Sequence, residues 1–317
     1  MKTMSLVMLL AGAFFCHRCA RADTFCSGTS QFEIEFVPID SPNNPADSTG
    51  DPNPVGKVDY VYRMGKHEVS RDMITKASNH GGLGITLDPM LNVTNGPRES
   101  MPATGITWFE ATRFVNWLNT STGHSPAYKF NVNGFELWQP GDAGYNPANP
   151  FRNSQAFYFL PSVNEWYKAA YFDASTAVYY AYPTGTNTIP TAIGSGAAPN
   201  TAVYGQAEEQ GPADVTLAGG LSPYGTMGQG GNVWEWEETE YDLGNDTTYF
   251  ARGIRGGMWH APDGRLNSAH RVNGVPGYDF YLVGFRVASV PEPSTLFLVA
   301  LGAFGLFLRR RFSSSRP

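Results

Sequence analysis

The chain has 317 residues, of which 42% are apolar and 14% aromatic, so it can bury one large core. Only 16% of the residues are charged and the formal net charge is −6, which leaves no basic face and argues against nucleic acid as a partner. The 35 Gly and 23 Pro predict many turns and irregular connections, and they argue against a helical bundle.

The first 22 residues have the features of a signal peptide. Lys2 precedes an apolar run over residues 6–15, and Ala20 and Ala22 are small residues at the alternate positions that a signal peptidase reads. We therefore predict export, with cleavage before Asp23. A buried N-terminal helix is the alternative, but the apolar run is too short to span a bilayer and carries the flanks of a signal peptide.

Cleavage before Asp23 also determines which cysteines remain in the exported chain. It removes Cys16 and Cys19 and leaves Cys26 as the single cysteine of the exported chain. No intrachain disulfide can then form, even in an oxidising compartment. We expect packing or a bound metal to stabilise the domain instead.

Two strands and a short helix are predicted next. Apolar and acidic residues alternate over residues 32–37, a pattern typical of a half-exposed strand. Residues 38–54 are rich in Pro, Asn, Asp and Ser and predict a loop, and residues 58–64 predict a second strand. Ser70 is a suitable N-cap for the helix that follows.

Two further helices are predicted by capping boxes. Thr107 and Glu110 stand three residues apart before an apolar run, which predicts an amphipathic helix to about Asn119. Ser162 and Glu165 repeat the pattern. Residues 128–152 and 184–210 are rich in Gly, Pro and Asn and predict long surface loops with short strands.

Three short blocks indicate the fold: Gly-Asn-Val-Trp-Glu-Trp over residues 231–236, Arg-Gly-Gly-Met-Trp over 255–259 and Gly-Phe-Arg-Val over 284–287. Their order and spacing resemble the sulfatase-modifying-factor family, which contains the formylglycine-generating enzymes. The resemblance implies an α+β, formylglycine-generating-enzyme type of C-type-lectin-like fold, with little regular structure, small antiparallel sheets and a few helices. We expect this domain to occupy residues 23–289.

The resemblance also identifies residues that this chain lacks. In formylglycine-generating enzymes, two cysteines after the Arg-Gly-Gly block bind copper, because thiolates select Cu(I). The matching positions here are Ala261 and Leu266, which cannot ligate a metal. We therefore do not expect copper or the copper-dependent oxidase activity.

Four other residues of this segment are of the types that bind iron or zinc: His260, Asp263, His270 and Asp279. Some relatives are non-haem iron enzymes, but they draw histidines from an additional helical domain for which this chain is too short. For His260 and His270 the alternative is a surface or hydrogen-bonded histidine. A non-haem-iron oxidative enzyme is our second hypothesis.

Calcium is the cofactor that the resemblance favours. It implies an ion held by the backbone carbonyls of Gly231 and Val233 and by the carboxylate of Glu235. A further family ligand, usually Asn or Asp, falls on Gly228, which has no side-chain oxygen. The alternative is that Glu235 pairs with a nearby arginine such as Arg286.

The C-terminal segment, residues 290–317, resembles the PEP-CTERM sorting signal. It consists of Pro291, Glu292 and Pro293, an apolar run over 296–308, and the basic residues Arg309, Arg310 and Arg311. The resemblance implies processing by an exosortase, a membrane transpeptidase of Gram-negative bacteria. Because the run is shorter than the ~20 residues of a transmembrane helix, we expect a transient anchor in the inner membrane. A core helix is the alternative.

Together these features predict an exported protein, anchored by its C-terminal segment and then found at the cell surface or in the extracellular matrix. We expect a non-catalytic binding or structural module that engages a peptide, glycan or protein ligand through its loops.

Overall fold

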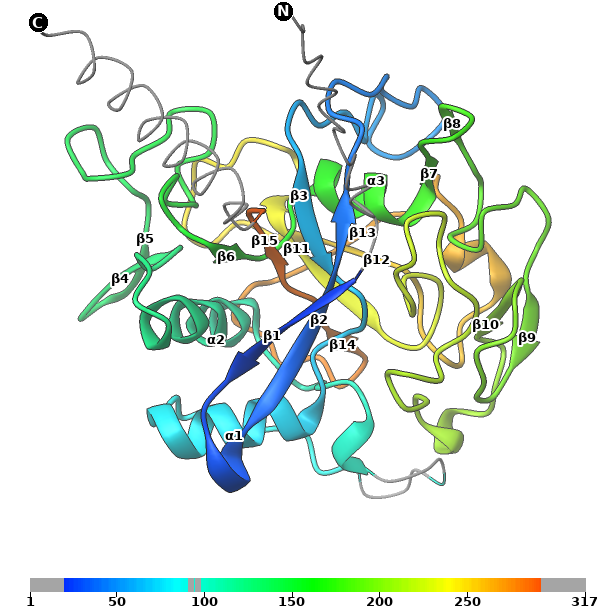
Figure 1. Cartoon of the computed structure of the whole chain (residues 1–317), viewed down its shortest axis with the longest axis horizontal. Helices are drawn as coiled ribbons and strands as arrows, with labels where there is room; N and C mark the ends of the chain where they lie inside the picture. Colours follow the sequence, from blue (N-terminus) through cyan, green and yellow to red (C-terminus); the bar gives the residue numbers. More distant parts are fainter. Residues whose placement is uncertain (1–19, 91–93, 95–97, 292–317) are drawn as a thin grey trace, which may run out of the picture.

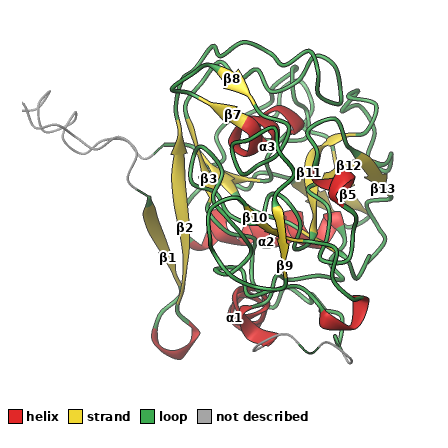
Figure 2. Cartoon of the chain, turned by 90° about the vertical axis from the view of Figure 1, so that its right-hand side faces the viewer, coloured by secondary structure: helices red, strands yellow, loops and turns green. Residues whose placement is uncertain are grey.

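The computed structural model describes residues 20–90, 94 and 98–291 (Figure 1). In this part of the chain the α-helices are α1 (Arg71–Gly81), α2 (Trp108–Ser121) and α3 (Val163–Tyr171). Short 3-10 helices lie at Gly28–Ser30, Arg98–Ser100, Glu208–Gln210 and Asp263–Leu266. Loops and turns form much of the molecule (Figure 2). The expected α+β class with little regular structure is confirmed.

The larger sheet has five antiparallel strands in the order β1-β2-β3-β15-β6. They are β1 (Arg21–Phe25), β2 (Phe32–Ile39), β3 (Tyr62–Gly65), β15 (Ala288–Ser289) and β6 (Tyr158–Phe159). The first and last strands of the described chain therefore belong to one sheet, and β15 lies between two neighbours.

The three sequence blocks meet in a second sheet of order β13-β12-β11-β14. Its strands are β11 (Trp234–Glu240), β12 (Arg252–Arg255), β13 (Val272–Gly274) and β14 (Val283–Gly284). Strand β11 is antiparallel to β12 and parallel to β14. This pairing brings together residues far apart in the sequence.

Three two-stranded ladders lie in the long loops. They are β4 (Lys129–Asn131) with β5 (Gly134–Glu136), β7 (Phe172–Asp173) with β8 (Val178–Tyr179), and β9 (Thr191–Ile193) with β10 (Thr201–Val203). The β9–β10 pair is parallel and the other two are antiparallel. Short strands in both predicted loop regions, residues 128–152 and 184–210, are thus confirmed.

The predicted helix starts are confirmed. Ser70 accepts a hydrogen bond from the N–H of Met73 at the start of α1. Both capping boxes are complete, with Thr107 and Glu110 at α2 and Ser162 and Glu165 at α3. Each box satisfies backbone N–H groups that have no partner within the helix.

The strand boundaries differ from the prediction. Strand β2 runs to Ile39, whereas β3 begins only at Tyr62 rather than at residue 58. Val58 is held by a loop instead, because its N–H donates to Asn44 Oδ1 at 3.1 Å and its carbonyl accepts from the N–H of Asn43 at 3.0 Å. At Val58 a hydrogen bond to the Asn44 side chain, distant in the sequence, therefore replaces the strand pairing that we predicted.

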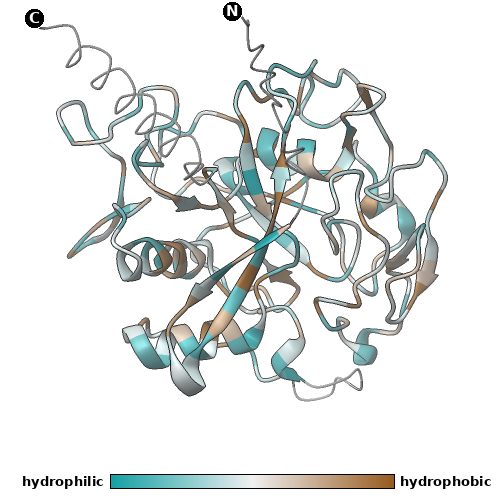
Figure 3. Ribbon diagram, viewed as in Figure 1, coloured by the Kyte–Doolittle hydropathy of each residue, from teal (hydrophilic) through white to brown (hydrophobic). Residues whose placement is uncertain are grey.

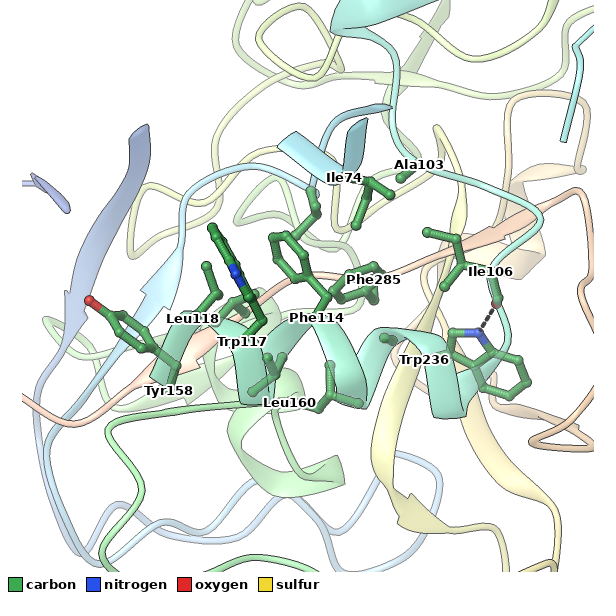
Figure 4. Close-up of a cluster of buried hydrophobic side chains, with 14 of the residues drawn as sticks. Ile74, Ala103, Ile106, Phe114, Trp117, Leu118, Tyr158, Leu160, Trp236 and Phe285 are labelled. Atoms are coloured by element: carbon green, nitrogen blue, oxygen red, sulfur yellow. Dashed lines mark hydrogen bonds between the residues drawn. The ribbon is translucent and has the colours of Figure 1, made fainter. Parts of the chain in front are cut away.

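The hydrophobic core lies between α2 and the sheets (Figure 4). Phe114 and Leu118 of α2 are fully buried, and the Phe114 ring lies 5.7 Å from that of Phe285. The indole N–H of Trp236 donates to the Ile106 carbonyl at 2.9 Å. Both hydrophobic and hydrophilic residues occur along α2 in Figure 3, as an amphipathic helix requires.

Strand β11 buries four carboxylates, each paired with an arginine. The pairs are Glu235–Arg286 at 2.6 Å, Glu237–Arg255 at 2.6 Å, Glu238–Arg152 at 2.7 Å and Glu240–Arg252 at 3.0 Å. All four glutamates are fully buried. Buried charges are tolerated only when they are paired and hydrogen-bonded, so these pairs hold β11 to its surroundings.

The two ends of the described domain meet at Arg63. Its guanidinium donates to Asp23 of β1 at 2.9 and 2.7 Å and to the carbonyl of Val290 at 3.2 Å. Ala20 and Ala22 are exposed beside this contact. Cleavage before Asp23 would therefore keep the Arg63 pair, although the limits at residues 22/23 and 289/290 remain predictions.

Most of the predicted sorting signal is outside the described residues. Pro291 is exposed and is the last residue described. Glu292, Pro293, Arg309, Arg310 and Arg311 lie beyond it, as do residues 1–19 of the predicted signal peptide. Within the described ranges, no helix has the length and hydropathy needed to cross a bilayer.

Candidate functional site

The positions that match the copper cysteines are part of the core. Ala261 and Leu266 are almost completely buried, and Leu266 packs with Tyr182, Ala202 and Tyr204. The turn that leads to them uses Gly257 at φ +86°, where an added Cβ would lie 3.0 Å from Leu266. The segment therefore contributes apolar packing at both positions.

The histidines of this segment lie in separate contacts. The His260 ring packs edge-on against Trp259, and its enclosed Nδ1 has no hydrogen-bond partner among the described residues. His270 Nε2 is 2.8 Å from Arg265 Nη1, and the His270 ring lies 5.7 Å from the Trp234 ring. Burial, with the charges of nearby arginines, lowers the pKa of His270.

The geometry shows no assembled iron site. Across residues 20–90, 94 and 98–291, no group of three or more His, Cys, Asp or Glu side chains is placed to hold a metal ion. His260, His270, Asp263 and Asp279 are thus not brought together as a ligand set. Iron binding remains a prediction.

The predicted calcium carboxylate is already engaged. Glu235 Oε1 accepts from Arg286 Nη2 at 2.6 Å, while its Oε2 accepts from Arg286 Nε and from Trp166 Nε1, each at 2.7 Å. This is the arginine pairing that the sequence left open as the alternative for Glu235. Gly231 and Val233 flank Asn232 in the turn that enters β11.

A second carboxylate lies at the same turn. Asn232 Nδ2 donates to Glu68 Oε1 at 2.9 Å, whereas the enclosed Oε2 of Glu68 has no partner among the described residues. Burial raises the pKa of Glu68 to about 7, Arg286 opposes this rise and Glu235 adds to it. An enclosed carboxylate oxygen without a donor is the kind of group that a hard cation satisfies.

Gly228 makes room for this carboxylate. A Cβ added at Gly228 would lie 2.6 Å from each oxygen of Glu68. The Glu68 oxygens therefore occupy the space beside the position where the family places a side-chain ligand. The sequence does not indicate a role for Glu68, because its neighbours Gly228 and Asn232 are brought to it only by the fold, and Asn232 is 164 positions further along the chain.

A groove of about 1150 Å³ runs along the outer face of α2, and we call it the α2 groove. The β4–β5 hairpin forms the opposite wall, and the C-terminal end of α1 closes one side. Its lining includes the aromatic residues Phe109, Trp117, Phe130, Phe135 and Tyr249 and the polar residues Arg113, Asn131 and Asn133. The groove thus combines partly exposed aromatic side chains with a few polar groups, as small-molecule sites do.

Comparisons with solved structures show the fold. Treponema denticola variable protein 1 is 19% identical, with 85% of this chain and 99% of that chain covered and a TM-score of 0.58. CarF is 18% identical over 82% of this chain and 99% of that chain, with a TM-score of 0.54. PvdO from Pseudomonas aeruginosa is 16% identical over 85% and 98%, with a TM-score of 0.53. At these identities the likeness concerns the fold alone.

Comparisons at the sequence level give the family. The model of the PEP-CTERM protein-sorting motif matches residues 289–311, which confirms the expected C-terminal signal and supports export and sorting. No curated protein matches the sequence. The model of the sulfatase-modifying factor enzyme 1-like domain matches residues 48–290, more than half of the sequence. The chain therefore belongs to the sulfatase-modifying factor enzyme 1-like domain family.

Proposed function

We propose that this family member is a non-catalytic binding module, exported and sorted to the cell surface or matrix after processing by an exosortase and a transient stay in the inner membrane. The observation that carries the proposal is the burial of Ala261 and Leu266, because apolar core residues stand where thiolates would bind copper. The α2 groove supports a binding role, since it is open to solvent and has ring faces for a ligand.

An oxygen-consumption assay tests this proposal. The purified protein is incubated with copper and a cysteine-containing peptide, and no turnover is expected. Metal analysis after tag-free purification tests the iron alternative, and a His260→Ala/His270→Ala double variant is expected to leave the metal content unchanged. Peptide oxidation, or a transition metal that the double variant loses, would refute the binding module.

Calcium binding at the turn before β11 is part of the same proposal. Glu68 Oε2 and the carbonyls of Gly231 and Val233 would supply oxygen ligands, while Glu235 would hold Arg286 beside them. Bound calcium would provide structural stabilisation in a chain whose exported part has one cysteine.

Thermal unfolding with calcium and with a chelator tests the site. Calcium is expected to raise the melting temperature of the wild type, and Glu68→Gln is expected to remove this increase. Asp59→Asn, at an exposed carboxylate, serves as the control and should keep it. A wild-type melting temperature that is the same in calcium and in chelator would exclude the site.

A further inference from the structure

The α2 groove lies along side chains that the helix leaves wholly or partly outside the core. Phe109, Arg113, Asn116 and Thr120 follow one another at intervals of three or four residues, so they lie on one face of α2 and line the groove. The opposite face carries buried residues such as Phe114 and Leu118. The groove therefore lies at the edge of the core, where Phe109 and the hairpin residues Phe130 and Phe135 pack against it and remain partly exposed.

A row of aromatic rings crosses this surface. The Phe109 ring lies 6.0 Å from Phe135 and 5.7 Å from Tyr249, and Phe130 lies 5.8 Å from Phe135. Tyr249 is 61% exposed, and the three phenylalanines are half-buried. The apolar C–H faces of sugar rings pack on such aromatic faces, while sugar hydroxyls remain free for polar partners.

Arg113 gives the groove a partly exposed cation, whose carboxylate neighbour in the groove is Glu110. Its side chain is 42% exposed, and Nη2 is 3.7 Å from Glu110 Oε1, beyond hydrogen-bonding distance. Its Nε is enclosed and has no hydrogen-bond partner among the described residues. Glu110 Oε2 is occupied by the N–H and hydroxyl of Thr107 in the capping box. The enclosed Nε is out of reach, so a ligand carboxylate would meet this guanidinium at the exposed part of the side chain.

The α2 wall favours a sugar over a peptide. The backbone N–H and C=O groups of α2 are bonded within the helix, so this wall offers an extended peptide no main-chain partners. The facing hairpin contributes the exposed side chain of Asn133, whose amide suits hydroxyl groups, whereas the Asn131 amide is bonded to Glu136 and to the N–H of Asn133. Apolar ring faces together with one carboxylate describe an acidic sugar.

We propose that the α2 groove binds an oligosaccharide that contains uronic acid, with its sugar rings on Phe109, Phe135 and Tyr249 and one carboxylate on Arg113. This inference rests on the proposed binding function and specifies its ligand class. The ligand is bound without any covalent step.

Calorimetric titration of the purified full-length protein with tetragalacturonate tests the inference. Neutral galactotetraose has the same number of rings without carboxylates, and the peptide Tyr-Glu-Tyr-Glu has rings and carboxylates without sugar. Tetragalacturonate is expected to bind at least tenfold more tightly than either. Raising the salt concentration should weaken its binding, because part of the attraction is between charges.

Two pairs of matched variants locate the ligand. Arg113→Gln is expected to weaken tetragalacturonate about tenfold and to leave galactotetraose unchanged, whereas Arg265→Gln, at an exposed arginine outside the groove, should change neither. Tyr249→Ala should weaken both sugars about threefold to tenfold. Tyr278→Ala, at a tyrosine that is equally exposed but outside the groove, is its control. Melting temperatures verify that all four variants fold.

Three results would overturn the inference: no sugar binding at millimolar concentration, equal affinity for the neutral sugar, or binding unaffected by both groove variants. The glycan assignment would also be overturned if the peptide bound more tightly than tetragalacturonate and Tyr249→Ala weakened this peptide binding. The proposal of a binding module would stand in that case. Peptide oxidation in the oxygen assay would instead refute the proposed function, so the two failures are distinguishable.

Discussion

Replacing Glu237 by Gln tests whether the buried ion pairs of β11 are needed for stability. Glu237 Oε1 accepts from Arg255 Nε at 2.6 Å and Oε2 from Arg271 Nε at 2.9 Å, and all three side chains are almost fully buried. Glutamine at this position leaves the guanidinium charges of Arg255 and Arg271 buried without the carboxylate that balances them. Its amide N–H₂ also faces one of the two N–H donors, with which it cannot form a hydrogen bond. Breaking a buried pair in this way costs about 3–5 kcal/mol, a large part of the stability of a domain.

Urea unfolding followed by tryptophan fluorescence measures this cost, and thermal unfolding provides a second measure. For a domain of this size the loss corresponds to a decrease of about 6–20 °C in melting temperature. The control is Asp59→Asn, because the Lys57–Asp59 pair is mostly exposed, at 3.8 Å, and should change stability by less than about 1 kcal/mol. If Glu237→Gln is no more destabilising than this control, our view of the β11 pairs is wrong.

Three further changes have defined outcomes. Burial lowers the pKa of Lys168 to about 8, so between pH 8 and the unfolded value of 10.5 only the unfolded chain binds this proton, and the stability of the wild type rises with pH. Urea unfolding at pH 7 to 10 should therefore show that Lys168→Met becomes less stable relative to the wild type as the pH rises. A difference that stays constant with pH contradicts this. Asp23→Asn removes the carboxylate that accepts two hydrogen bonds from the Arg63 guanidinium, and should destabilise by about 1.5–3 kcal/mol in urea. An unchanged midpoint would show that this contact does not stabilise the domain. Gly228→Ala places a Cβ 2.6 Å from Glu68 at φ +78° and should cost about 1–3 kcal/mol by thermal unfolding, with Gly264→Ala, where no atom lies within 4 Å, as the unaffected comparison.

The helix starts were predictable because their determinants are local. Each capping box places both of its partners within four residues, so Thr107 with Glu110 and Ser162 with Glu165 are visible in the sequence. The fold class was also predictable from the sequence, because the order and spacing of the three family blocks are sufficient to identify the family. The start of β3 was not predictable, because it depends on Asn44 bonding to Val58 across a loop.

The candidate site was only partly predictable for the same physical reason. The loss of thiols at Ala261 and Leu266 follows from residue identity alone. The pairing of Glu235 with Arg286, 51 residues away, was one of two alternatives that the sequence left open. The contact of Glu68 with Asn232, 164 positions away, has no local pattern at all. The glutamates of β11 resemble those of a half-exposed strand, yet all four are buried and paired with arginines from three other segments, two of them in β12.

The position of β15 determines how the domain would carry a mechanical load. This strand leads directly to Pro291 and is hydrogen-bonded on one side to β3 and on the other to β6. Tension on a tethered tail would therefore enter the middle of a sheet, where two ladders share the force, and not at an edge that peels away one bond at a time. Arg63, which is bonded to both Val290 and Asp23, would also pass part of this force to the first strand of the domain.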